Sequence, residues 1–309
     1  KNGYIPVFIP WFTDPEYREE VPKKFKRTPD EKELAKKFKL DNEQLMFRRR
    51  KIAQNGIELF KQEYPSYPDE AFLTTGRPVF NPDQLQKLLP DTRDVEGRLA
   101  LETDEWVNHN RGELTTFIKH DSGEQYVIGA DVSMGIRNGD YSVAIVLDSK
   151  KRQVATWRGH VHPDYFATVL FQLGTYYNDA FICVENNSHG ILTCTRLGKD
   201  LAYPNFYTEV QHDKITDRET VKLGFTTTVK TKPLIIDQLR ASMREKELEL
   251  NDKVTIREML TYIVTENGAM EAEHGCYDDC VMSLALANYV HEGAWEPTES
   301  TDEFYMEIV

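Results

Sequence analysis

The apolar positions in the middle of the chain fall into short runs that are typical of β-strands. Residues 126–132 and 141–147 form two such runs, separated by a polar segment that contains Gly135 and the pair Asn138-Gly139. A third run, 153–158, follows a short polar turn. Glycine and asparagine favour chain reversal, so the pattern predicts an antiparallel meander of three strands. Asp131 lies near the end of the first strand.

The next two segments predict a helix followed by a buried strand. Apolar residues in 163–177 recur at the spacing of an amphipathic helix, and 180–184 is a continuous apolar run that ends in Glu185. A strand, helix and strand in this order favour parallel pairing with the first strand of the meander. Asp131 and Glu185 are then expected side by side at the carboxyl ends of the strands, where open α/β sheets bind ligands.

A late helix begins with two adjacent acids. After Asp278 and Asp279 the sequence VMSLALANYV is apolar on nearly every face, which predicts a helix buried against the sheet. Acids at a helix start can simply cap it. Two desolvated carboxylates side by side would instead be costly without a cation. The nearby His274, Cys276 and Cys280 raise the alternative of zinc, but they lack a paired C-x-x-C knuckle.

The remaining segments complete the predicted organisation. We expect helices over 29–38 and 41–55, a short strand at 205–208, a protruding β-rich insertion over 209–229, and a helix from a Thr231 cap to Met243. The domain prediction follows from these elements: a partial helical lobe (1–80), a connector that ends in one or two strands (81–120), a mixed α/β domain (121–293) and an acidic tail (294–309). Lys1 indicates an internal start.

Composition and charge constrain the partners. The 309 residues carry a formal charge of −13, which argues against nucleic acid, but residues 1–80 hold 16 Lys and Arg against 13 Asp and Glu, and 271–309 hold ten acids and no Lys or Arg. Any attraction for phosphate must therefore be local. We expect it over 207–232, where aromatic residues alternate with basic ones: Lys214, Arg218, Lys222, Lys230 and Lys232. No apolar window approaches the roughly 18 residues of a membrane span, and four scattered cysteines favour a reducing compartment.

Three acidic motifs together resemble one family. The sequences IGADVSMGIRNGDYSVAIVLD, VENNSHG and HGCYDDCVMSLALA resemble the nuclease domain of the large terminase subunit of tailed bacteriophages, in the ribonuclease H-like superfamily. The segment LFKQEYPSYPDEAFLTTGRPVF resembles the end of the terminase packaging ATPase. The resemblance implies an RNase H-like mixed sheet, a meander plus parallel strands flanked by helices, and a metal-dependent endonuclease that cuts concatemeric double-stranded DNA into genome lengths.

The same resemblance implies a cofactor, site roles and partners. Two Mg²⁺ or Mn²⁺ ions would be held by oxygen ligands, with Asp131 bridging them, Glu185 holding one, and Asp279, with Asp278 as partner or substitute, holding the other. Asp140, in the NGDYS stretch, matches a further acidic position of the family. Portal protein and the small terminase subunit are the implied protein partners, the implied location is the host cell cytoplasm, and no membrane is involved.

Several alternatives remain open on the sequence. No G-x-x-x-x-G-K-[ST] loop occurs, so no ATPase activity is expected from this chain. An actin-like or sugar-kinase ATPase shares the meander but binds phosphate with a Gly-Thr-rich loop. The corresponding stretch here, VSMGIRNGD, has no Thr and carries Arg and Asp. A resolvase or transposase of the RNase H-like type fits the acids equally well. A docking module for a portal or capsid partner, with the acids as a solvated face, is the non-enzymatic alternative.

Overall fold

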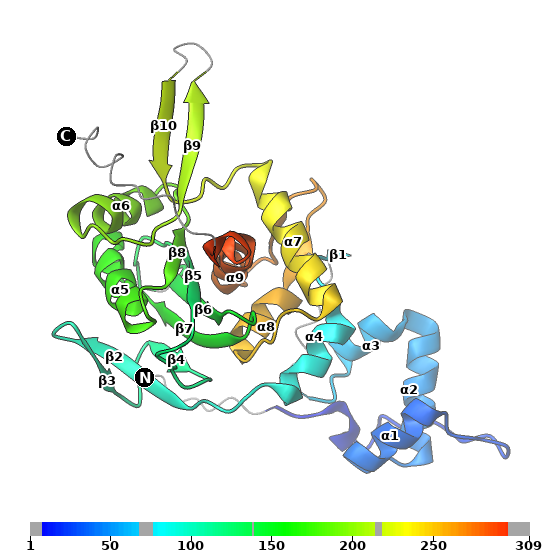
Figure 1. Ribbon diagram of the computed structural model, residues 1–309. Coiled ribbons are helices and arrows are strands. Elements are labelled where there is room, and N and C mark those ends of the chain that lie inside the picture. Colours follow the sequence, from blue (N-terminus) through cyan, green and yellow to red (C-terminus); the bar gives the residue numbers. More distant parts are fainter. Residues whose placement is uncertain (1–7, 68–76, 138, 214–217, 296–309) are drawn as a thin grey trace.

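A seven-stranded mixed sheet forms the centre of the molecule (Figure 1). The computed structural model describes residues 8–67, 77–137, 139–213 and 218–295. The strand order is β3-β2-β4-β7-β6-β5-β8. Its strands are β2 (Gly97–Glu102), β3 (Glu105–Asn108), β4 (Leu114–Thr116), β5 (Tyr126–Asp131), β6 (Ser142–Asp148), β7 (Gln153–Gly159) and β8 (Phe181–Val184). Only β5 and β8 pair in parallel, so the predicted meander and parallel strand are both confirmed.

Alternation along β5 and β6 divides the apolar core between the two faces of the sheet. Val127 and Val143 belong to one buried cluster, whereas Ile128 and Ala144 belong to the other. Successive side chains of a strand point to opposite faces, so strands that are apolar at every position must be covered on both sides. Helices supply that cover (Figure 1).

The two faces carry different helices. On one face lie α5 (Pro163–Tyr176), α6 (Gly190–Thr195) and the π-helical turn η4 (Arg196–Asp200). On the other lie α4 (Pro82–Leu88), α7 (Thr231–Glu245), α8 (Lys253–Leu260) and α9 (Asp279–Val290). Because α9 packs on β5, β6, α7 and α8 together, it is apolar all round, as its sequence predicted. None of the helices in the described ranges combines the length and apolar character that crossing a bilayer requires.

Gly129 lets α9 lie directly on β5. A Cβ atom at this position would stand 2.1 Å from the carbonyl oxygen of Ser283 and 2.4 Å from the backbone nitrogen of Ala287. Ser283 fixes the contact, since its hydroxyl accepts a hydrogen bond from Asp131 N–H at 3.2 Å and donates one to the Val143 carbonyl at 3.0 Å. The start of α9 is thereby held beside the end of β5.

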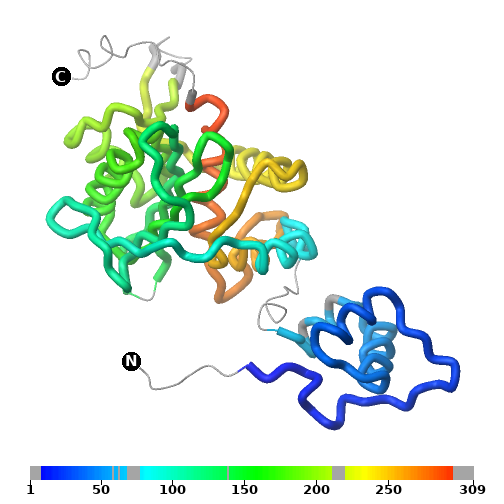
Figure 2. The backbone as a smooth tube through the Cα atoms, turned by 60° about the horizontal axis from the view of Figure 1, so that its bottom comes forward, coloured from blue at the N-terminus to red at the C-terminus, as the bar shows by residue number. Residues whose placement is uncertain are grey.

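The N-terminal segment forms a small helical lobe with its own core. It contains the short 3₁₀ turn η1 (Trp11–Thr13) and the helices α1 (Pro29–Phe38), α2 (Asn42–Asn55) and α3 (Ile57–Glu63). Both α1 and α2 begin with a capping box, at Thr28 and at Asp41 respectively. Trp11, Leu45 and Phe60 are among the buried residues of a cluster separate from the two sheet clusters. The lobe lies to one side of the sheet in both views (Figures 1 and 2).

The stretch expected to be a connector contributes to the sheet. Strands β2, β3 and β4 extend it beyond β7, and Leu85 of α4 and Leu89 of the 3₁₀ turn η3 (Leu89–Asp91) are buried in the core under α9. A small three-stranded sheet of β1 (Arg77–Pro78), β11 (Tyr262–Val264) and β12 (Met270–Ala272) also joins this stretch to the C-terminal part. We therefore propose that the α/β domain begins near residue 77, not at 121.

Two local predictions are wrong in detail. The short strand at 205–208 is only an isolated bridge from Phe206 to Ile182. Thr231 is the first residue of α7, and the hydroxyl that accepts from its backbone N–H is that of Thr228, at 3.1 Å. The reversal between β5 and β6 lies where the sequence predicted it, between residues 131 and 142; Asn138 lies outside the described residues.

The predicted insertion is a separate two-stranded sheet. Strands β9 (Thr208–Asp213) and β10 (Arg218–Leu223) pair antiparallel and project from the body of the molecule (Figure 1). The protruding β-rich insertion is confirmed.

The contact at Gly129 can be tested by one added methyl group. Gly129→Ala should lower the free energy of unfolding by about 1–3 kcal/mol, because backbone atoms of α9 cannot move away without disturbing the core. Gly293→Ala is the control, since a Cβ there meets nothing within 4 Å. Urea unfolding measures both. Equal stability of the two variants would show that α9 does not depend on this close approach.

Candidate metal centre

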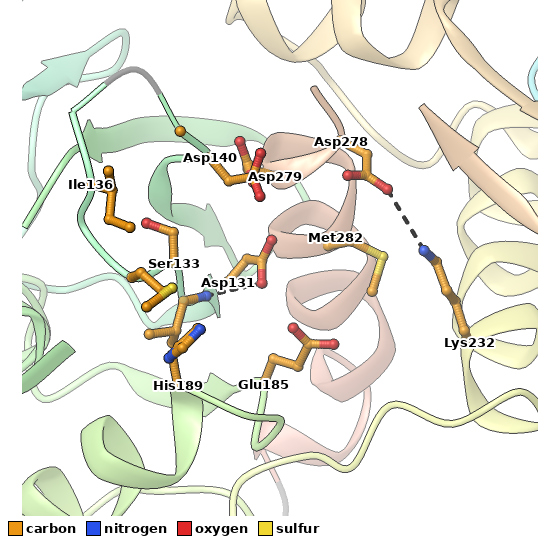
Figure 3. A pocket seen from close by; sticks show the side chains of 13 residues that line it. Asp131, Ser133, Ile136, Asp140, Glu185, His189, Lys232, Asp278, Asp279 and Met282 are labelled. Carbon is orange, nitrogen blue, oxygen red and sulfur yellow. Dashed lines mark hydrogen bonds and ion pairs between the residues drawn. The ribbon is translucent and has the colours of Figure 1, made fainter. Parts of the chain in front are cut away.

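Five acidic side chains line one cavity of about 370 Å³ (Figure 3). They come from the end of β5, the loop before β6, the residue after β8 and the start of α9: Asp131, Asp140, Glu185, Asp278 and Asp279. Lys232 and His189 also line this cavity, which we call the acid pocket. The structure thus brings together all the acids that the sequence singled out as candidate metal ligands.

Parallel pairing places Asp131 beside Glu185. Ala130 of β5 is opposite Val184 of β8, and Glu185 N–H donates to the Ala130 carbonyl at 2.9 Å. Asp131 and Glu185, which follow this pair of residues, therefore lie at the same edge of the sheet. Asp131 Oδ1 accepts from Val132 N–H at 2.9 Å, and Glu185 Oε1 accepts from Asn187 Nδ2 at 3.1 Å.

The two acids at the start of α9 do not cap it with their side chains. Asp278 occupies the N-cap position without a side-chain capping bond, and its carboxylate lies 3.6 Å from Lys232 Nζ. Asp279 Oδ2 accepts instead from Tyr141 N–H, at 3.1 Å. The capping alternative raised by the sequence therefore does not describe the contacts of either carboxylate.

Glu258 of α8 takes the capping role, and the sequence analysis missed it. Its Oε2 accepts from Cys280 N–H in the first turn of α9 at 2.7 Å, and its Oε1 lies 3.2 Å from the guanidinium of Arg158. That guanidinium lies over the ring of Tyr141, 3.5 Å from its centre. Glu258 stands about 20 residues from α9 in the sequence, and only the packing of α8 on α9 brings them together, so no local signal could have identified it.

Burial and mutual repulsion make the acid pocket expensive to ionise. Burial raises the pKa of Asp131 well above its usual range, and the neighbouring carboxyl of Glu185 raises it further. Burial also raises the pKa of Asp279 to about 7, despite the hydrogen bond from Tyr141. The pKa of Asp278 is raised by burial too, although the Lys232 ammonium opposes the shift.

The donor set suits a hard divalent cation. All five acids offer oxygen ligands, which Mg²⁺ and Mn²⁺ prefer, and the Lys232 ammonium is paired with Asp278. Within the described ranges, no three His, Cys, Asp or Glu side chains already stand as a closed ligand group. Of the residues considered for zinc, Cys276 is exposed and Cys280 is buried, and neither lines the acid pocket.

The residues predicted to bind DNA do not all lie on the β9–β10 hairpin. Lys222 lies on β10 opposite Glu209, and Lys230 is exposed at the start of α7. Lys232 lies away from the hairpin, in the acid pocket. Lys214 falls outside the described residues, and of Arg218 only the backbone, in β10, is described.

Replacing a carboxylate of the acid pocket by its amide should show whether that carboxylate is repelled by its neighbours or stabilises the fold. A carboxyl whose pKa is raised on folding stabilises the protein at low pH, and that stability is lost as the pH rises through the folded-state pKa. The metal-free native protein should therefore lose stability between pH 5 and pH 8, by a few kcal/mol at most. Asp279→Asn should flatten this decline, and Asp131→Asn should be at least as stable as the native protein at pH 8.

Urea unfolding in EDTA at both pH values provides the measurement. Asp200→Asn, at an exposed position remote from the pocket, should follow the native protein within about 0.5 kcal/mol. If Asp131→Asn or Asp279→Asn is less stable than the native protein at pH 8, the carboxylate supports the fold.

The fold is that of known terminase nucleases. The chain matches no family model. The large terminase nuclease from thermophilic phage G20c, in a crystal structure with bound cobalt, superposes with a TM-score of 0.50 at 22% identity, over 70% of this chain and 98% of that one. The same nuclease with bound magnesium gives a TM-score of 0.48 at 22% identity over the same shares of the two chains. The nuclease domain of the Thermus phage P74-26 large terminase gives 0.47 at 23% identity, over 70% of this chain and 97% of that one. The chain has the RNase H-like fold of a large terminase nuclease domain.

Proposed function

We propose that this chain is a divalent-metal-dependent DNA endonuclease of a viral packaging motor. The observation that carries the proposal is the convergence of Asp131, Glu185 and Asp279, from three separate elements, on one cavity. Carboxylates that are costly to ionise together gain most from a bound divalent cation. The fold and the cobalt bound in the similar terminase nuclease structure support the same proposal.

The residues around the pocket would hold the acids in place. Asp131 lies beside Glu185 and lines the same cavity as Asp279, so these three carboxylates together would hold two divalent ions. Val132 N–H, Asn187 and Tyr141 N–H orient Asp131, Glu185 and Asp279 respectively. When bound, Mg²⁺ or Mn²⁺ would supply an activated water and charge stabilisation at the phosphodiester.

The two acids that remain have supporting roles in this proposal. Asp278 is paired with Lys232, so it would act as a partner or substitute for Asp279. Asp140 lines the pocket from the loop before β6 and would be an additional ligand. The partners follow by resemblance: concatemeric double-stranded DNA as substrate, and the portal protein and small terminase subunit in the motor, in the host cell cytoplasm.

Plasmid cleavage tests the proposed activity. Native protein with Mg²⁺ or Mn²⁺ should nick and linearise supercoiled plasmid, and EDTA should stop the reaction. Asp131→Asn, Glu185→Gln and Asp279→Asn should each abolish cleavage, because each removes a charged ligand, whereas Asp200→Asn should cut at the native rate. Mn²⁺ should also raise the melting temperature of the native protein more than that of the three variants.

The same experiment separates the alternatives. A docking module would cut no DNA with any metal. A variant that melts earlier without metal and still nicks at the native rate would remove that residue from the site. A resolvase-type nuclease would cut branched junctions in preference to the linear duplex that a packaging nuclease cuts.

The β9–β10 hairpin is proposed to follow the DNA backbone. Replacing Lys214, Arg218 and Lys222 by Ala should weaken duplex binding and reduce the dependence of log Kd on log salt by roughly one unit for each lost phosphate contact. Fluorescence anisotropy over a salt series in EDTA measures both effects. An unchanged salt slope would reject a role for the hairpin in binding the backbone.

A further inference from the structure

A second cavity, of about 450 Å³, lies between strands of the sheet and the start of α8. Five basic side chains line it: Arg93, Arg98, Arg111, Arg158 and Lys253. Three acids, Asp94, Glu113 and Asp252, line it as well. In a chain with a formal charge of −13, such a concentration of cations in one cavity stands apart from the average surface. We call it the arginine pocket.

Three of the five cations form no ion pair among the residues that the structure describes. Arg93 pairs with Glu249 at 2.8 Å and Arg158 with Glu258 at 3.2 Å. Arg98, Arg111 and Lys253 are exposed and form no ion pair with any residue in the described ranges.

The acid most deeply buried in this cavity is already engaged. Asp252 accepts from Val254 N–H at 2.9 Å and from the Thr255 hydroxyl at 3.1 Å, both within the first turn of α8. Its carboxylate is therefore already hydrogen-bonded to the first turn of α8. The exposed cations remain available to an anion from outside.

Arg158 also retains hydrogen-bonding capacity. Its Nε is buried without a hydrogen-bond partner among the described residues, while another of its nitrogens bonds Glu258. A buried donor without an acceptor is costly. An arginine that lines a cavity can also donate to a phosphate oxygen through its guanidinium. The guanidinium is already held against Tyr141, so little freedom would be lost on binding.

The arginine pocket adjoins the acid pocket at two consecutive residues. Asp140 lines the acid pocket, and Tyr141 lines the arginine pocket. The backbone N–H of Tyr141 holds Asp279, while its ring contacts Arg158 on one hand and stacks on His160, 3.9 Å between ring centres, on the other. One aromatic residue therefore forms part of the wall between the two cavities.

A polyanion that approaches the acid pocket meets five carboxylates. Without cations nearby, its phosphates would be repelled everywhere except at bound metal. Guanidinium groups form paired hydrogen bonds with phosphate and contribute most to backbone binding when they are not already paired. Arg98 and Arg111 meet that condition at the cavity next to the site.

We propose that the arginine pocket binds a backbone phosphate of the same DNA whose scissile phosphate enters the acid pocket. This inference rests on the proposed nuclease function and adds to it a second, metal-independent anchor. The anchor sets which phosphodiester along the strand reaches the acids.

The test compares two double variants with the same change in charge. Arg98→Ala with Arg111→Ala removes two exposed, unpaired cations of the pocket. Lys119→Ala with Lys199→Ala removes two exposed cations that line neither cavity. Binding to a labelled linear duplex is measured in EDTA over a salt series. The arginine variant should show a salt slope smaller by about one to two units, and the lysine variant should keep the native slope.

To identify the bound phosphate, the phosphates of the duplex are replaced one at a time by neutral methylphosphonates. In the native protein, one substitution at a fixed distance from the cut should weaken binding. In the arginine variant, the same substitution should have no further effect, because the contact is already lost. Arg111→Gln alone is the second variant if the double substitution fails to fold.

The outcomes separate this inference from the function on which it rests. The proposed anchor would be wrong if the arginine variant kept the salt slope of the native protein, or if the methylphosphonate substitution still weakened its binding. Neither result would contradict metal-dependent cleavage by the native protein. A smaller slope with no sensitive phosphate at any position would mean general attraction only, which also overturns it. Absence of metal-dependent cleavage by the native protein would instead overturn the nuclease proposal.

Discussion

The contact between α9 and β5 at Gly129 is the constraint on which the rest of the structure depends. A helix that is apolar on all sides can be stable only inside the core, and full burial of each large aliphatic side chain contributes about 1.5–3 kcal/mol. The absence of a side chain at Gly129 allows the helix backbone to reach the strand. Ser283 then joins the helix to both β5 and β6. The packing that completes the core also delivers Asp278 and Asp279 to the strand ends.

The buried acids of the candidate site lower the stability of the fold. Three of its acids have pKa values raised chiefly by burial, so the metal-free fold carries a repulsion that a hydrophobic pocket would not. The surrounding structure offsets this with hydrogen bonds to individual carboxylates and with the ammonium of Lys232 at Asp278. Functional sites commonly carry such local cost, which the rest of the core tolerates.

The sequence revealed what is encoded locally and missed what depends on tertiary packing. The meander, the parallel strand and the all-apolar helix follow from runs of adjacent residues, so their positions and their acids could be predicted. Strands β2 and β3 could not, because their side chains are only partly buried and charged residues interrupt the alternation. Glu258 reaches the start of α9, and Lys232 reaches the acid pocket, from helices whose own sequences do not indicate where they pack. Lys232 was assigned to the basic insertion because only its neighbours in the chain were visible.

The position of α9 along the chain has a consequence for synthesis. Among the long elements described, it is the last to leave the ribosome, and domains fold as units as the chain emerges. Until it arrives, one face of the sheet lacks its cover and the strand-end carboxylates lack Asp278 and Asp279. A nascent or prematurely terminated chain would therefore present an incomplete acid pocket. Assembly of the core and completion of the acid pocket are the same event.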